Sequence, residues 1–151
     1  MKLDGTIDIA APRDQVWAVV IDPTDLAACV PGVREVRQID ANTFTGTVRA
    51  SIGPLDGDFA FRSVLTMTTV PTDLVVDVDG TDSVTKSRVV THLEVALTEP
   101  AAGGTTLAYH ATVTVKGRLA IVGEMVLRAT AGMMIGQVSR CLRARLEPPD
   151  R

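Results

Sequence analysis

The sequence predicts an α+β fold in which one curved antiparallel sheet of seven strands wraps a long C-terminal helix. Three observations support this. Most of the chain alternates apolar and polar residues with a period of two, which is typical of half-buried strands. Successive alternating runs are joined by short turns, many of them containing Gly or Pro, which favours an antiparallel meander. Residues 118–146 contain no proline and are rich in Leu, Met, Ala and Arg, which favours a single long helix.

Length and composition bound the protein class. The chain has 151 residues, 46% of them hydrophobic and 22% charged, which suits one folded domain. We expect that domain to span residues 1–147 and residues 148–151 to form a short tail. The 15 basic and 18 acidic residues give a net charge of −3, so there is no basic footprint for nucleic acid. Because aromatic residues make up only 3%, smaller aliphatic side chains must fill the interior, which leaves room easily.

The first elements are a strand and two helices. Residues 2–9 alternate strictly, which predicts a strand. Ala11-Pro12 opens a helix, because proline is tolerated in the first turn. Asp22-Pro23 begins a second, short helix by the same logic, with the aspartate as its cap. This helix must end by residues 30–32, since proline cannot continue it.

Six further strands are expected at residues 33–39, 43–52, 58–70, 74–79, 84–98 and 105–116. Their alternation directs Val, Leu, Ile, Phe and Met to one side, with Ser63, Thr91 and Tyr109 as the polar members. Acid–base catalysis needs a titratable group that points into a pocket. Since none falls on the inward side of these strands, the sequence favours a binding protein over an enzyme.

The cysteines and histidines suggest no metal centre. Cys29 and Cys141 are far apart in the sequence and are expected to be two separate, small buried side chains, not a disulfide or a zinc site. His92 and His110 fall on the outward side of neighbouring strands. If Leu97 paired with the Thr at position 105, the two histidines would lie opposite each other. We expect two surface histidines rather than metal ligands.

The long helix is expected to present two apolar sides. Met125, Met133 and Met134 lie on it, and methionine adapts to irregular neighbours, so it suits either a pocket wall or plain core. Ile121, together with residues 127 and 135, should point away from the sheet, which suggests contact with a partner, a membrane surface or a second copy. The arginines at positions 140, 143 and 145 complement the negative end of the helix.

Local motifs carry a family resemblance. They are Ala11-Pro12 with Val16-Trp17, Asp22-Pro23 with Leu26, Cys29-Val30-Pro31-Gly32, Ile52-Gly53-Pro54, and Gly117-Arg118-Leu119-Ala120 with Gly123. Together with the element order, they resemble the helix-grip fold of the START-like (SRPBCC) superfamily, and within it the CoxG-like family, that of the G subunit of carbon monoxide dehydrogenase. The resemblance implies a hydrophobic cavity between sheet and long helix that holds an apolar ligand. It also implies an accessory role toward molybdenum-containing CO dehydrogenase-type enzymes, including membrane recruitment and quinone handling.

We therefore expect non-enzymatic binding of a lipophilic small molecule, lipid or quinone-like, in an internal cavity of roughly 300–1,000 Å³. No cofactor or metal is expected. The expected ligand-binding residues are Leu26, Val30, Phe44, Val48, Phe59, Phe61, Leu65, Met67, Val76, Thr91, Leu93, Tyr109, Val113, Val122, Met125, Ala129 and Met133.

Two alternatives remain open at this stage. One is a hydrolase or cyclase of the same superfamily, which would use Tyr109 and Ser63 with Asp58 or Arg62 at a pocket mouth. The other is an adaptor that docks a molybdenum hydroxylase through the outer side of the long helix.

The segment Val30-Pro31-Gly32 is expected to gate ligand entry, because it follows a short helix with few apolar anchors. It would face Leu55 and Met133 across the entrance. A disulfide from this segment to the start of the long helix should slow ligand exchange. The N-terminus has no signal-peptide run, and the longest apolar stretch is interrupted by charges, so a cytoplasmic location is expected, with peripheral membrane contact left open.

Overall fold

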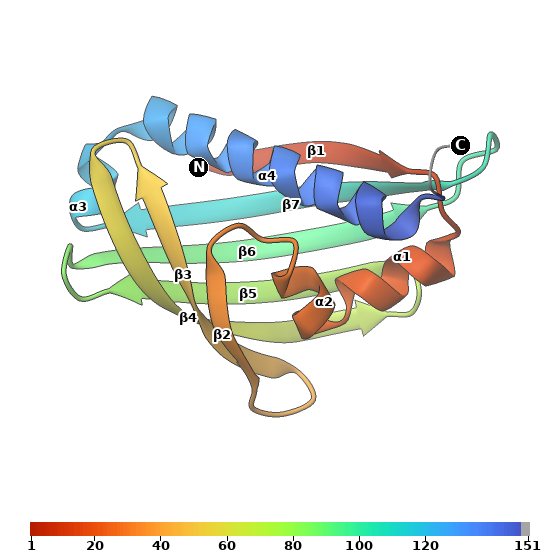
Figure 1. Ribbon diagram of the computed structural model, residues 1–151, viewed down its shortest axis with the longest axis horizontal. Helices are drawn as coiled ribbons and strands as arrows, with labels where there is room; N and C mark the ends of the chain where they lie inside the picture. The colour runs from red at the N-terminus through yellow and green to blue at the C-terminus, as the bar shows by residue number, and fades with distance from the viewer. Residues whose placement is uncertain (149–151) are drawn as a thin grey trace.

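The computed structural model describes residues 1–148 and has seven strands and four helices in that part of the chain (Figure 1). In chain order the elements are β1 (Lys2–Ile9), α1 (Arg13–Val20), α2 (Pro23–Ala27), β2 (Val33–Gln38), β3 (Thr43–Ile52), β4 (Leu55–Thr69), β5 (Asp73–Asp82), β6 (Ser87–Thr98), β7 (Thr105–Lys116), α3 (Arg118–Ile121) and α4 (Glu124–Leu146). Apart from Pro148, the tail expected at residues 148–151 lies outside the described residues.

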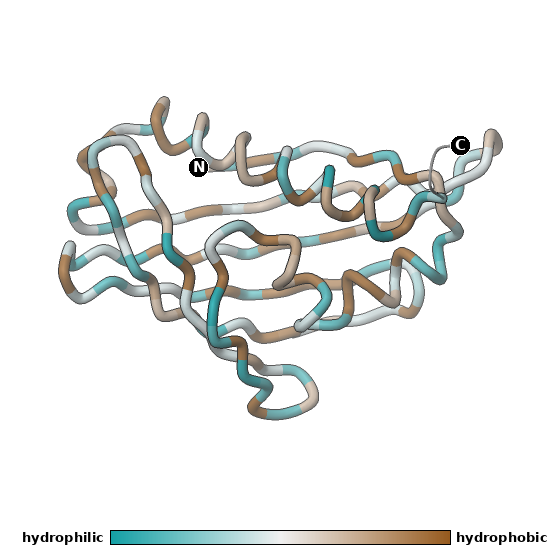
Figure 2. Tube along the Cα trace, in the orientation of Figure 1, coloured by the Kyte–Doolittle hydropathy of each residue, from teal (hydrophilic) through white to brown (hydrophobic). Residues whose placement is uncertain are grey.

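The strands form one antiparallel sheet in the order β1-β7-β6-β5-β4-β3-β2. Figure 1 shows α4, α1 and α2 on the same face of this sheet, while β2, β3 and β4 turn across the molecule relative to β5, β6 and β7. The expected α+β class, with a curved sheet around a long C-terminal helix, is confirmed. Figure 2 shows apolar and polar segments alternating along the strands, as the period-two pattern requires.

A dense core lies at one end of the sheet. There α1 and the C-terminal half of α4 pack on the ends of β1, β6 and β7. Ile9, Val16, Leu97 and Leu142 are at most 2% exposed. Burying each such side chain stabilises the fold by about 1.5–3 kcal/mol. This core fixes the C-terminal half of α4 against the sheet.

The start of α2 follows the sequence expectation. Asp22 caps it, with Oδ1 accepting hydrogen bonds from the N–H groups of Thr24 (2.9 Å) and Asp25 (3.1 Å). Pro23 occupies the first helical position. Pro12 instead precedes α1, which begins at Arg13.

The long helix is broken, which corrects the expectation of one helix over residues 118–146. Gly123 has a φ of +91°, a backbone conformation open to glycine, and it separates the short α3 from α4. Successive side chains along a helix are rotated by about 100° about its axis, so a break in the helix changes which residues face the sheet. Met125 and Met133 are 85% and 67% exposed, and Ala129 on the same side is exposed too.

A bulge in β4 makes a second correction. Leu65 pairs with Val76, but Met67 pairs with the next residue along, Val75, so one residue of β4 has no partner. An inserted residue turns every later side chain to the other face. Met67, expected to point inward, therefore lies on the outer face and is 50% exposed.

A hydrogen-bond chain closes the end of the molecule opposite the dense core. β5 extends to Asp82, beyond the expected end at residue 79. The buried carboxylate of Asp82 accepts hydrogen bonds from the Val84 N–H (3.0 Å) and the Thr85 hydroxyl (2.8 Å). Thr85 Oγ1 lies 2.9 Å from Ser87 Oγ, which accepts from the Leu119 N–H (3.0 Å). The chain thus ties the β5–β6 turn to the start of α3.

Replacing Asp82 should break this chain. For Asp82→Ala we expect a loss of about 1–3 kcal/mol in the free energy of unfolding, because buried donors then lack their acceptor. Urea unfolding measures it. Asp79→Ala is the matched control on the same strand, since Asp79 forms an exposed ion pair with Arg88 (2.6 Å) that contributes at most about 1 kcal/mol. Equal losses in the two variants would contradict a special role for Asp82.

Candidate functional site

The middle of the sheet presents rows of inward side chains beneath α4. One row, in register across five strands, consists of Val113, Thr91, Val78, Ser63 and Phe44. The next row consists of Val115, Val89, Gly80, Phe61 and Gly46. Ser63 and Val113 are buried, but most of the others are only half-buried. The middle of the inner face is therefore covered less completely than the dense core beside it.

The aromatic rings of this face lie close to the sheet. A Cβ added at Gly46 would sit 2.8 Å from Phe61 Cζ, and one added at Gly5 would sit 2.7 Å from Tyr109 Cζ, so each ring lies across a glycine of the neighbouring strand. Phe44 meets Phe61 edge to face, with ring centroids 6.1 Å apart. Rings that lie along the sheet fill little of the space between sheet and helix.

The structure has a small hollow and an open groove, and neither of them is the enclosed drug-sized cavity that the sequence predicts. A small one of about 10 Å³, enough for one water, is lined by Ala50, Ile52, Leu55, Gly57, Phe59, Thr85 and Leu119. An open groove of about 340 Å³ is lined by Met1, Val113, Thr114, Val115, Ala120, Glu124 and Leu127. The groove lies between the end of β7 and the corner of α3 and α4, next to the rows described above.

Most of the expected ligand-binding residues do share the inner face. The register places Phe59, Phe61, Leu65, Val76, Thr91, Leu93, Tyr109 and Val113 on one side of the sheet, together with Phe44 and Val48. Leu26, Val30 and Val122 are half-buried. Met67, Met125, Ala129 and Met133 are instead exposed to solvent. The sequence reasoning missed Leu127, which was expected to point outward but is half-buried and lines the groove.

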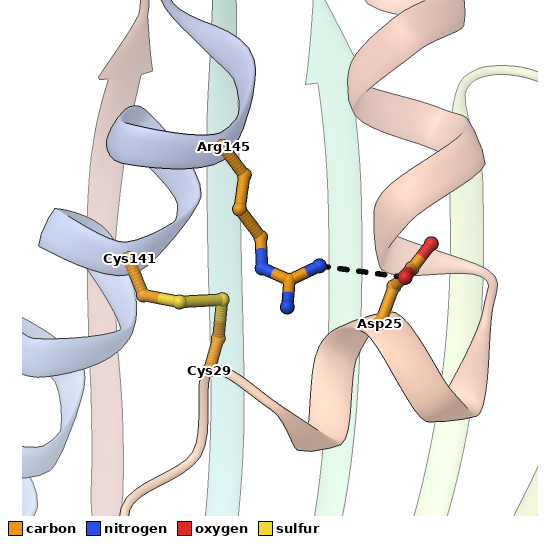
Figure 3. Close-up of a disulfide and its surroundings, with 4 residues drawn as sticks. All are labelled: Asp25, Cys29, Cys141 and Arg145. Atoms are coloured by element: carbon orange, nitrogen blue, oxygen red, sulfur yellow. Dashed lines mark hydrogen bonds and ion pairs between the residues drawn. A yellow bond between two sulfur atoms is a disulfide. The ribbon is translucent and has the colours of Figure 1, made fainter.

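Cys29 and Cys141 form a disulfide, which corrects the expectation of two separate thiols (Figure 3). Their Cα atoms are 5.4 Å apart although 112 positions separate them in the sequence. The bond joins the segment after α2 to the last turns of α4. Beside it, Arg145 Nη1 lies 3.4 Å from Asp25 Oδ1. Spacing alone holds no signal for this bond, because only the folded chain brings the two residues together.

Removing the disulfide should destabilise the protein measurably. For the double variant Cys29→Ser/Cys141→Ser we expect a loss of about 2–5 kcal/mol in the free energy of unfolding, because the cross-link restricts a long loop of the unfolded chain. Urea unfolding with and without dithiothreitol measures it. The reductant should lower the stability of the parent protein and leave the double variant unchanged. A double variant as stable as the oxidised parent would contradict the prediction.

The histidines lie on the outer face but not opposite each other. His92 pairs with Thr112 and His110 pairs with Glu94, two positions away from the expected register. His92 Nδ1 lies 2.7 Å from Asp77 Oδ1, and this hydrogen bond raises the pKa of His92. His110 forms a hydrogen bond with Asp4. In the described part of the chain, no three His, Cys, Asp or Glu side chains are placed to hold a metal ion.

The groups named for a catalytic alternative do not converge. Ser63 is on β4 and Tyr109 on β7, with β5 and β6 between them, which separates the strands by about 14 Å. Arg62 and Asp58 point to the outer face, where Asp58 pairs with Arg49 (3.2 Å). The inward carboxylate that the sequence reasoning missed is Asp82, and both its oxygens are engaged by the β5–β6 turn.

Comparison with known families agrees with this architecture. The family model for CoxG, described as the G subunit of carbon monoxide dehydrogenase, matches residues 5–147. The chain belongs to the CoxG family. No curated protein matches the chain. Within residues 1–148, no helix combines the length and apolar character needed to cross a membrane.

Solved structures share the fold at low identity. A conserved protein from Geobacillus kaustophilus is 20% identical, with a TM-score of 0.89 over 96% of this chain and 94% of that one. A START superfamily protein from Mycobacterium smegmatis is 16% identical, with a TM-score of 0.70 over 97% of both chains. The di-domain ARO/CYC protein BexL is 13% identical, with a TM-score of 0.66 over 99% of this chain and 51% of that one. These matches place the CoxG-family chain in the START-like fold.

Proposed function

We propose that this protein binds a lipophilic small molecule, lipid or quinone-like, between α4 and the inner face of the sheet, without catalysing a reaction on it. The observation that carries the proposal is the half-buried apolar face in the middle of the sheet, continuous with the open groove at β7, α3 and α4. Half-buried apolar side chains gain free energy when a ligand removes them from water, at about 25 cal/mol per Å². Membership of the CoxG family supports an accessory role.

The inner face offers few polar contacts to such a ligand. Thr91 and Tyr109 are half-buried and carry hydroxyl groups that can donate a hydrogen bond. A mostly apolar wall with a few polar groups is typical of small-molecule sites. The Thr91 hydroxyl would hydrogen-bond a polar group of the ligand, while Leu93 and Val76 cover its apolar part. A hydrolase or cyclase function would need a free acid or base here, and the inward Asp82 is already bonded within its turn.

Filling the inner face should weaken ligand binding. We expect Thr91→Trp to weaken binding of a quinone with a decyl side chain by at least about tenfold, because an indole would occupy the proposed ligand space. Tryptophan fluorescence or native mass spectrometry of the titrated protein measures it. Thr112→Trp, on the outer face of β7, is the matched control and should bind as the parent does. If the parent binds no lipophilic molecule, or if both variants bind equally, the proposed site is wrong.

We propose further that the outer side of α3 and α4 docks a CO dehydrogenase-type molybdenum hydroxylase. This outer stripe consists of Ile121, Met125 and Met133, all at least 67% exposed. Met125 and Met133 lie two turns apart on one face of α4, and exposed apolar side chains grouped in this way are typical of a protein contact. The sequence predicts a similar outer stripe on this helix. Because the helix breaks at Gly123, Ile121 is the one residue that belongs to both the expected and the observed stripe. We propose that this contact occurs in the cytoplasm.

Charges on the outer stripe should prevent this docking. For Ile121→Glu/Met125→Glu we expect loss of co-purification with the hydroxylase and unchanged binding of the decyl quinone, because the substitutions lie away from the inner face. Met67→Glu, at an exposed position on the outer face of the sheet, is the control and should keep the partner. Retention of the enzyme by the double variant would contradict the docking face. If the stripe binds phospholipid vesicles instead, its partner is a membrane surface.

A further inference from the structure

We propose that the Cys29–Cys141 disulfide acts as a redox-operated latch. It holds residues 22–33, which form one side of the ligand site and which we call the α2 flap. The oxidised bond holds the flap against α4, and its reduction releases the flap and speeds ligand exchange. The ligand-exchange part rests on the proposed function, whereas the release of the flap does not. Both parts follow from how the flap is attached.

The α2 flap has almost no apolar anchor of its own. Within residues 22–42, all of which the structure describes, Cys29 is the only buried residue, at 5% exposure. None of the five residues of α2 is buried. Segments with few buried apolar contacts open at low free-energy cost. The side chain that does anchor the flap is thus the one that forms the covalent bond.

Apart from a backbone hydrogen bond that Gly32 accepts from the Arg49 N–H of β3 (2.9 Å), the other ties of the flap are weak or local. The ion pair between Asp25 and Arg145 is exposed and 3.4 Å long, so water and salt screen it. β2, whose first residue is the last residue of the flap, lies at the edge of the sheet and is bonded on one side only. Its pairing with β3 is interrupted by a bulge between Arg34 and Arg37. The disulfide is therefore the main connection of the flap to α4.

The flap covers part of the inner face. Figure 1 shows α2 and the turn after it on the same face of the sheet as α4, and Figure 3 shows the disulfide bridging the two. Leu26 and Val30 in the flap are half-buried, and Val33 pairs with the inward Val48 of β3. Moving the flap away would uncover the side of the ligand space formed by β3. The sequence predicts a gate in this segment, and the native bond attaches it near the C-terminal end of α4.

The chemistry requires a dithiol reductant. One of its thiolates attacks the sulfur of Cys141, the more exposed of the two residues, and forms a mixed disulfide while Cys29 leaves as a thiolate that takes up a proton. The second thiol of the reductant then attacks the mixed disulfide and releases Cys141. Two electrons pass to the protein, which ends with two thiols, and the reductant ends as a cyclic disulfide. Arg145, one helical turn after Cys141, supplies a positive charge that favours thiolates.

Hydrogen exchange of the whole protein tests release of the flap without any ligand. After dithiothreitol, with both free thiols verified by alkylation and mass spectrometry, amides of residues 26–33 should exchange at least about tenfold faster, while those of β6 and β7 change little. Cys29→Ser/Cys141→Ser should behave as the reduced parent does without reductant. Leu119→Ala, a destabilised control at the opposite end of the molecule, should leave the flap protected.

The exchange of a bound probe tests the gate. N-phenylnaphthylamine, a fluorescent apolar probe, should leave the reduced protein at least about tenfold faster than the oxidised one. Uniform exchange of all amides, a flap that exchanges equally in both forms, or cysteines that dithiothreitol does not reduce in the folded protein would overturn the latch. Equal probe release from both forms despite an opened flap would overturn the gate. Failure of the probe to bind either form would count against the proposed function, and faster flap exchange would still support the latch.

Discussion

One helix has to cover the concave face of a sheet that is much wider than the helix. Seven strands about 4.8 Å apart span roughly 30 Å, whereas a helix with its side chains is about 10 Å wide. The backbone of α4 comes nearest to the sheet at β1 and β3, so it bridges the concave face between them. The middle strands consequently keep apolar side chains that no element fully buries.

The two ends of the molecule make this geometry stable. At one end, Leu142 and the disulfide hold α4 to α1, α2 and the ends of the strands. At the other end, the chain from Asp82 to Leu119 fixes α3 at the β5–β6 turn. With both ends attached, α4 can stay in place without dense packing beneath its middle. The ligand site that we propose lies in this middle part, where side-chain packing contributes least to the stability of the fold.

The strands could be predicted from the sequence because a period of two assigns each side chain to a face, and the register agrees for most of them. The errors come from single residues that change the phase of a pattern. The bulge before Met67 turns it outward, and the break at Gly123 rotates Met125 and Met133 away from the sheet. The disulfide is an error of another kind. Cys29 and Cys141 meet only because the α2 flap folds over onto α4, and no local pattern encodes that contact.

The most direct test of this account is methyl NMR of the protein titrated with a quinone carrying a decyl side chain. The account predicts shifts at methyl groups of the inner face and the groove, such as those of Val76, Leu93 and Leu127, in one saturable set. Val64 and Val90, which the register places on the outer face, should not move. Shifts confined to the outer face or to the outer stripe, with the inner methyl groups unchanged, would contradict it.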